Sequence, residues 1–188
     1  MNEPVKHAPL SDDPEALNFG PYMCVADARL RLISVFDDLR YDRADVDMLS
    51  TAMRGHAITR LNPLGFRQVS GTILLHEISG ARCFIPKFHA LGASPFDITR
   101  YTPRGADDFY ILTPTQTACQ YVDFYPLADA VERVKALILH QPINLYKLLD
   151  FLENKSTHRD FAKKIGHLRL IQREAVSSEP LKSRRALG

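Results

Sequence analysis

Apolar residues along the first third of the chain recur with the spacing of α-helices. Over residues 25–39 they return every three or four positions, which predicts an amphipathic helix with an apolar face of Ala28, Leu32, Val35, Phe36 and Leu39. A shorter helix is predicted over residues 44–53, where apolar residues share one face and Gly55 follows at a position typical of a helix C-cap. The chain is therefore expected to begin with two helices.

The middle of the chain changes to the two-residue period of β-strands. Residues 66–91 alternate and are rich in β-branched and aromatic residues, and the Ser-Gly pair at 79–80 interrupts them, so a β-hairpin is predicted. Residues 108–112 (DFYIL) and 118–124 (ACQYVDF) predict two further strands, joined through TPTQT. Pro114 lies at the end of the first of these, where its missing N–H does least harm to a sheet.

The last third of the chain returns to helical spacing. Apolar stripes predict helices over residues 127–140, 143–153 and 157–175, and Thr157 with Asp160 resembles a capping box at the start of the third. Strands in one run and helices in others favour an α+β fold. The sequence thus predicts an antiparallel sheet of about four strands, in two hairpins, flanked by N-terminal and C-terminal helices.

Length and composition favour one domain. A chain of 188 residues is long enough to bury a single core, which is expected over residues 17–176. Residues 1–16 and the basic residues 177–188 are expected to be flexible tails, because they contain little apolar surface to offset their ordering entropy. No apolar run has the length of a membrane span, no secretory signal is recognised, and three widely spaced cysteines favour free thiols, so a cytoplasmic location is expected.

The net charge of +2 conceals an asymmetry along the chain. Residues 1–60 carry 7 basic and 10 acidic side chains, whereas residues 153–188 carry 9 basic and 4 acidic ones. Such a basic end is compatible with a nucleic acid or an acidic partner, but a solvated helix face and tail is the favoured explanation, because charge runs are usually solvent faces. A nucleic-acid interface would place a recognition helix at about 157–175, with Lys163, Lys164 and Arg169 towards phosphates.

The first hairpin contains residue types that also build metal and acid–base sites. A two-residue turn would place His76 opposite Cys83 and Glu77 opposite Arg82, with His89 following. The spacing matches no known metal motif, so no metal site is predicted. Glu77 and Arg82 are instead expected to form a cross-strand ion pair.

The loop over residues 88–108 is the first candidate for ligand binding. It combines His89, Asp97, Arg100 and Arg104 between two predicted hairpins, and long loops of mixed charge often carry function. The two arginines are suited to hold a carboxylate or phosphate through forked hydrogen bonds. We therefore predict that these four residues, with His76, contribute to a ligand site.

The segment TPTQTACQ, residues 113–120, is the second candidate. Its hydroxyl and amide groups, Thr115 and Gln116 among them, are suited to line a small-molecule pocket. The same residue types also occupy strands and cap turns. Cys119 has no histidine placed by the sequence to activate it as a nucleophile.

These features favour a cytoplasmic module that binds a small molecule or a protein partner. A homo-oligomer is expected because the apolar stripes of residues 127–138 and 143–152 look wide for one four-stranded sheet to cover. The alternative is an enzyme that uses His76, His89, Asp97 and Arg100; the motifs of common hydrolases, nucleotide-binding proteins and metalloproteases are not present. A second alternative is nucleic-acid binding through the basic C-terminal helices, and the sequence identifies no cofactor.

Overall fold

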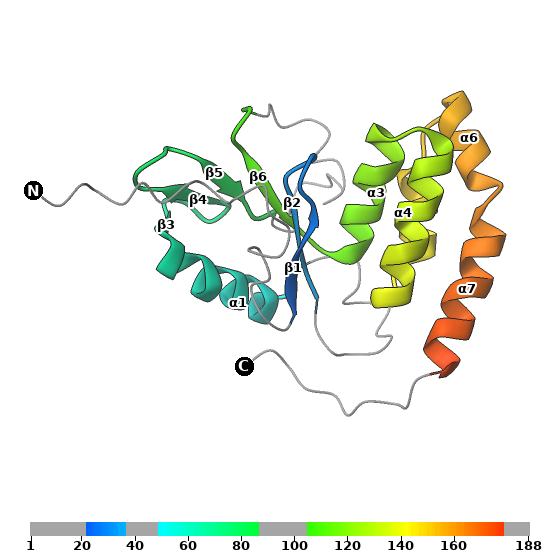
Figure 1. Ribbon diagram of the computed structural model, residues 1–188, viewed down its shortest axis with the longest axis horizontal. Helices are drawn as coiled ribbons and strands as arrows, with labels where there is room; N and C mark the ends of the chain where they lie inside the picture. Colours follow the sequence, from blue (N-terminus) through cyan, green and yellow to red (C-terminus); the bar gives the residue numbers. More distant parts are fainter. Residues whose placement is uncertain (1–21, 37–48, 87–104, 179–188) are drawn as a thin grey trace, which may run out of the picture.

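The computed structural model describes residues 22–36, 49–86 and 105–178 (Figure 1). The strands in these ranges are β1 (Met23–Asp27), β2 (Leu32–Val35), β3 (Phe66–Gln68), β4 (Ile73–His76), β5 (Arg82–Phe84) and β6 (Phe109–Leu112). The helices are α1 (Thr51–Leu61), the 3-10 helix η2 (Asn62–Leu64), α3 (Pro114–Phe124), α4 (Leu127–His140), α5 (Leu145–Phe151), α6 (Ser156–Ala162) and α7 (Ile165–Ser178). The predicted α+β class is confirmed.

The sheet is mixed, which corrects the prediction of about four antiparallel strands. In the described residues it has six strands in the order β1-β2-β6-β5-β4-β3. β6 lies in the middle and runs parallel to both β2 and β5, while the other neighbours pair antiparallel. A parallel pair requires a long crossover connection, and the residues between β5 and β6 provide it.

The helix predicted over residues 25–39 is wrong, because this region contains the β1–β2 hairpin. Asp27 accepts a hydrogen bond from the Leu30 N–H (2.8 Å), and Arg31 closes the turn onto the Ala28 carbonyl (3.2 Å). All four residues of β2 are buried. A short strand buried on both faces lacks the alternation that identifies strands, so its apolar run was compatible with either period.

The helix predicted over residues 44–53 begins later and extends further. Ser50 is its N-cap, because the Ser50 hydroxyl accepts a hydrogen bond from the Met53 N–H (3.1 Å). α1 buries Met53, Ala57 and Leu61 against one face of the sheet. Half of the predicted range, residues 44–48, lies outside the described residues.

The first predicted hairpin is confirmed in β4 and β5, with a register two residues away from the predicted one. Leu75 pairs with Arg82 and Leu74 pairs with Cys83, because the turn is longer than two residues. A shift of two leaves each side chain on its predicted face. β3 adds a third strand and places Phe66 opposite His76.

The strand predicted over residues 118–124 is wrong, because this segment is part of α3. Thr113 and Gln116 form a capping box: the Thr113 hydroxyl accepts from the Gln116 N–H (3.2 Å), and the Gln116 amide oxygen accepts from the Thr113 N–H (3.0 Å). Pro114 occupies the first turn, where its missing N–H costs no hydrogen bond. Residues 114–122 are all buried, so α3 has no polar stripe by which the sequence could identify a helix.

The other C-terminal helices agree with the prediction in outline. α4 and α5 lie within the predicted ranges, whereas the third predicted helix divides into α6 and α7 at residues 163–164. The predicted capping box at Thr157 is wrong, since Lys155 is the N-cap and makes no side-chain cap, and Asp160 pairs with Lys163 (2.7 Å). Gln172 of α7 closes the bundle through hydrogen bonds to both the N–H and the carbonyl of Ile143 (2.9 Å each).

The sheet separates two apolar cores (Figure 1). One lies between the sheet and α1, and the other between the sheet and the helices α3 to α7. The apolar stripes of α4 and α5 belong to the second core, so helices of the same chain cover them, and they no longer argue for an oligomer. None of the helices in the described part combines the length and apolar content of a membrane crossing.

Arg54 of α1 connects the helix to the loops of the neighbouring hairpin. Its guanidinium donates to the carbonyls of Ile85 (3.0 Å) and Pro86 (2.9 Å) and also to the carbonyl of Gly71. Burial lowers the pKa of this arginine. These three carbonyls belong to residues outside the strands, so Arg54 supplies the hydrogen-bond donor that strand pairing does not give them.

Replacing Arg54 with alanine is therefore expected to destabilise the fold by about 2 kcal/mol, because it leaves partly buried carbonyls without a donor. Urea unfolding at pH 7 measures this change. Arg60→Ala is the control, since Arg60 is an exposed arginine in the last turn of the same helix and should change stability by less than about 0.5 kcal/mol. Equal effects of the two substitutions would contradict the role of Arg54.

Candidate functional site

The predicted site residues fall into two groups. His89, Asp97, Arg100 and Arg104 lie outside the described residues. His76, Thr115 and Gln116 are described, but they lie at opposite ends of the sheet: His76 ends β4, next to the beginning of β5, whereas the threonine and the glutamine follow the end of β6. Among the described residues, the predicted site residues therefore do not come together: His76 lies at the other end of the sheet from Thr115 and Gln116.

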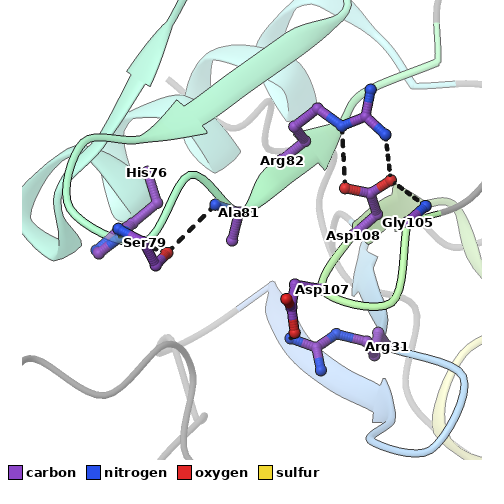
Figure 2. Close-up of polar contacts among 8 residues, drawn as sticks. All are labelled: Arg31, His76, Ser79, Ala81, Arg82, Gly105, Asp107 and Asp108. Carbon is purple, nitrogen blue, oxygen red and sulfur yellow. Dashed lines mark hydrogen bonds and ion pairs between the residues drawn. The ribbon is translucent and has the colours of Figure 1, made fainter.

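His76 holds the turn of its own hairpin together. Its side chain is 3% exposed and contacts the Phe66 ring, with 5.0 Å between ring centroids. Nδ1 accepts a hydrogen bond from the Ser79 N–H (3.1 Å), and Nε2 lies 3.0 Å from the Leu64 carbonyl oxygen, so Nε2 carries the proton. Figure 2 shows Ser79 beside the imidazole. Both ring nitrogens are thus engaged within the hairpin.

Thr115 and Gln116 are engaged in the same way at the beginning of α3. The Thr115 hydroxyl accepts a hydrogen bond from the Asn144 N–H (2.8 Å), which attaches the start of α5 to α3. The Gln116 side chain completes the capping box with Thr113. Both residues are at most 2% exposed. Their contacts explain why these residue types occur here without a ligand.

Arg82 and Asp108 form a forked ion pair at the amino ends of β5 and β6 (Figure 2). Two guanidinium nitrogens of Arg82 donate to the two carboxylate oxygens, at 3.0 and 2.6 Å, and the Gly105 N–H donates to the same carboxylate at 2.5 Å. Burial acts to raise the pKa of Asp108, but these hydrogen bonds and the arginine charge outweigh it, so the pKa lies below its ordinary value. The predicted Glu77–Arg82 pair is wrong: Glu77 pairs with Arg67 at 3.4 Å.

Arg31 lies on the other side of β6, beside Asp107 (Figure 2). Its guanidinium lies 4.1 Å from the centre of the Phe109 ring and 4.0 Å from the Asp107 carboxylate, which is 77% exposed. The Arg31 backbone is left-handed (φ 53°), a conformation that costs an arginine about 1 kcal/mol and closes the β1–β2 turn. The long distance and the exposed partner make this ion pair a weak one.

The contacts of Arg54 and the Arg82–Asp108 pair hold the two ends of the connection between β5 and β6. This connection contains the four predicted site residues that lie outside the described part. Arg54 binds the carbonyls of Ile85 and Pro86 where the chain leaves β5, and the Arg82–Asp108 pair holds the chain where it enters β6. His89, Asp97, Arg100 and Arg104 therefore belong to a connection with anchored ends. Their role in ligand binding stays a prediction.

Other buried polar groups are held in structural contacts. Asp27 accepts hydrogen bonds from the Tyr125 hydroxyl (2.8 Å) and from Arg133 (2.9 Å), which joins the β1–β2 hairpin to α3 and α4. Burial, assisted by the Asp27 charge, raises the pKa of both Tyr121 and Tyr125. Burial also raises the pKa of the Cys24 and Cys83 thiols, so these groups stay protonated and are weak nucleophiles.

A second buried histidine joins α3 to α6. His158 has a side chain 2% exposed; its Nε2 donates to Asp123 (3.0 Å), and its Nδ1 accepts from the Glu153 N–H (2.9 Å). His158 therefore belongs to the core of the C-terminal half and not to its basic surface. In the described ranges, no three histidine, cysteine or acidic side chains gather where they could hold a metal ion.

One surface of the C-terminal helices combines exposed apolar and basic side chains. Tyr146 of α5 is 55% exposed, and the Arg169 guanidinium lies 6.0 Å from the centre of its ring. On α7, Leu170 is 52% exposed, and Arg173 lies one helical turn after Arg169. An open hollow runs along this side of α7 and is lined by Gly166, Arg169, Leu170, Gln172, Arg173, Val176 and Ser177.

We name this surface the α7 flank and define it by Tyr146, Arg169, Leu170, Arg173 and Val176. The sequence analysis placed Arg169 in a possible nucleic-acid interface and did not single out the other four residues. A further signal was available, because Leu170 falls outside the apolar stripe of Ile165, Leu168 and Ile171. A large apolar residue out of phase with the buried stripe must face solvent or a partner.

Comparisons of the chain with protein-family models, with curated proteins and with solved structures find no match. The function therefore has to be inferred from the geometry of the described surfaces.

Replacing Asp108 with asparagine is expected to lower the midpoint of urea unfolding at pH 7 and to weaken its dependence on acid. The pKa of Asp108 is depressed in the folded state, so the unfolded chain takes up the proton first as the pH falls below about 4. The stabilisation by the ion pair is complete above this pH and is lost as the pH falls through the folded pKa.

Urea unfolding between pH 7 and pH 3 tests this expectation. The difference between the wild type and Asp108→Asn should shrink as the pH decreases. Asp107→Asn is the control, because Asp107 is exposed and its ion pair is long, so its effect should be small at every pH. A difference for Asp108→Asn that is constant across the range would show that the carboxylate charge contributes nothing to stability.

Proposed function

We propose that this protein is a binding module that recognises an acidic, partly apolar segment of a partner protein at the α7 flank. The observation that carries the proposal is the hollow along α7, where two arginines one helical turn apart lie beside the exposed Leu170 and the half-buried Val176. Guanidinium groups bind carboxylates through forked hydrogen bonds, and exposed apolar side chains gain from contact with a partner. An anionic segment with apolar residues satisfies both requirements.

The residue types of the flank are those that contribute most at protein interfaces. Tyrosine and arginine are enriched among the residues that dominate binding energy, and Tyr146 and Arg169 lie side by side. Arg169 and Arg173 have exposed side chains, and within the described part of the chain neither forms an ion pair with a carboxylate. Their charges are therefore available to an anionic partner.

Catalysis has weaker support from the described residues. His76 and His158 use both ring nitrogens within the domain, and the Cys24 and Cys83 thiols are kept protonated by burial. General acid–base or nucleophilic chemistry needs such groups to be accessible to a substrate. The enzyme alternative consequently depends on His89, Asp97 and Arg100, outside the described part.

Binding to duplex nucleic acid is also less well supported than binding to an acidic segment. At about 100° per residue, Arg169 and Arg173 point only about 40° apart on α7, whereas His167 points about 120° or more away from both. Lys163 is paired with Asp160, and Lys155 with Glu153. A phosphate backbone requires many cations on one surface, and two converging arginines fit a short acidic segment better.

Two earlier expectations remain part of the proposal. Free thiols at all three cysteines agree with a cytoplasmic location. A homo-oligomer would require a surface other than the apolar stripes of α4 and α5, which the second core covers.

A labelled acidic peptide tests the proposal directly. We expect a 16-residue peptide of alternating glutamate and leucine to bind the full chain in fluorescence anisotropy, with an affinity that falls as salt is added. Arg169→Ala with Arg173→Ala should weaken binding at least tenfold, equal to about 1.4 kcal/mol. Both arginines are exposed, so the double variant should keep its fold.

The matched control removes the same charge at the same spacing elsewhere. Lys155 and Arg159 are exposed and lie four residues apart on the neighbouring helix region, so Lys155→Ala with Arg159→Ala should leave the affinity almost unchanged. A peptide with glutamine in place of glutamate should bind more weakly. Equal losses in both double variants, or tighter binding of a random 20-base-pair duplex than of the peptide, would overturn the proposal.

A further inference from the structure

We propose that the partner segment binds the α7 flank as an amphipathic α-helix whose acidic residues lie one turn apart. This inference rests on the proposed function, because it concerns the same surface and adds the conformation and residue pattern of the ligand. It depends on the arc that the hollow covers on α7 and on the use of the α7 backbone groups within the helix.

The hollow occupies a face of α7 with the width of a helix–helix contact. At about 100° per residue, six of its lining residues fall within an arc of about 120°: Gly166, Arg169, Leu170, Arg173, Val176 and Ser177. Their separations of three, four and seven residues are those by which one helix packs against another. Five of the six are exposed, and α7 lies at the outer side of the helices in Figure 1. The face is about 16 Å long, or three helical turns.

A helix is the conformation in which a segment can lie on α7 and keep its backbone hydrogen bonds. The N–H and C=O groups in the middle turns of α7 are used inside that helix, so they offer no pairing to an extended peptide. An extended segment in the hollow would bury its own amide groups with few partners, which costs free energy. A helical segment satisfies these groups within itself, so only its side chains have to match the flank.

Gly166 allows the backbone of a partner helix to come close. A Cβ atom placed on Gly166 would have no neighbour within 4 Å, so the space above this residue is open. Packed helices have axes about 8–10 Å apart, and the distance depends on the side chains at the contact. Gly166 and Ser177 are small and lie at the two ends of the face, so a partner helix can contact both ends.

The side chains between these ends determine the pattern of the partner helix. Arg169 and Arg173 are four residues apart, so carboxylates at positions i and i+4 of the partner can bind both arginines. Leu170 is exposed and offers an apolar contact beside them. Carboxylates one turn apart repel each other in a free helix, and the arginines offset this repulsion. The segment is therefore expected to become helical on binding.

Two peptides of identical composition test the conformation. LEELLEELLEELLEEL and the alternating 16-residue peptide have the same glutamate and leucine content, but only the first places its leucines on one helical face. We expect the first to bind the full chain about fivefold more tightly in fluorescence anisotropy. The far-UV circular dichroism of its complex should show more helix than the sum of the free components. Proline in place of the eighth residue should remove the advantage, because proline breaks a helix.

The substitution Gly166→Gln tests the close approach on the side of the protein. The space above Gly166 is open, so the variant should fold normally, but the added side chain should weaken binding of LEELLEELLEELLEEL about threefold. The alternating peptide should be almost unaffected. His167→Gln is the matched control, since His167 is exposed and points about 100° away from Gly166 on α7. It should change neither affinity.

The outcomes separate this inference from the proposed function. If both peptides bind equally well and both lose affinity in Arg169→Ala with Arg173→Ala, the inference fails and the proposed function stands. If neither peptide binds, the proposed function fails and the inference fails with it. Equal effects of Gly166→Gln and His167→Gln would overturn the packing of a helix along this face, and the acidic binding site would remain.

Discussion

The burial of α3 over residues 114–122 is the constraint on which the rest of the C-terminal half depends. This helix follows the central strand β6 and lies between the sheet and the helices α4 and α5. Because it is buried on all sides, its polar groups must be satisfied within the protein. The Thr113–Gln116 capping box and the hydrogen bond from Asn144 to Thr115 do this at its beginning, and the Asp123–His158 pair does so near its end.

The burial of α3 also explains why so many polar residues of this chain have no free functional group. Threonines, glutamines and a histidine in a core must find partners, and those partners come from other helices and from the sheet. The buried Asp27 carboxylate also joins separate elements: it accepts hydrogen bonds from Tyr125 and Arg133 and so attaches the β1–β2 hairpin to the C-terminal helices. Polar chemistry inside this protein therefore holds its elements together, and the chemistry available to partners lies on the surface.

The α7 flank illustrates the difference. Gln172 attaches α7 to Ile143, two residues before α5, through two hydrogen bonds, and Tyr146 of α5 lies next to Arg169. Neither residue is needed to cover the core, since both are exposed. A buried anchor thus determines which exposed side chains become neighbours, and the surface it creates has the character of an interface.

The sequence by itself determined the fold class, the existence of the β4–β5 hairpin and the helical positions of α4 and α5. Each of these strands and helices has one buried and one more exposed face, so its apolar residues recur with a clear period. It did not determine β2 and most of α3, whose residues are buried on all sides and lose that period, and it assigned β1 to a helix together with β2. Only the tertiary structure decided that β6 lies between β2 and β5, that Arg82 pairs with Asp108 rather than Glu77, and that Tyr146 meets Arg169. These contacts join residues far apart in the chain, and their partners are selected by packing rather than by local spacing.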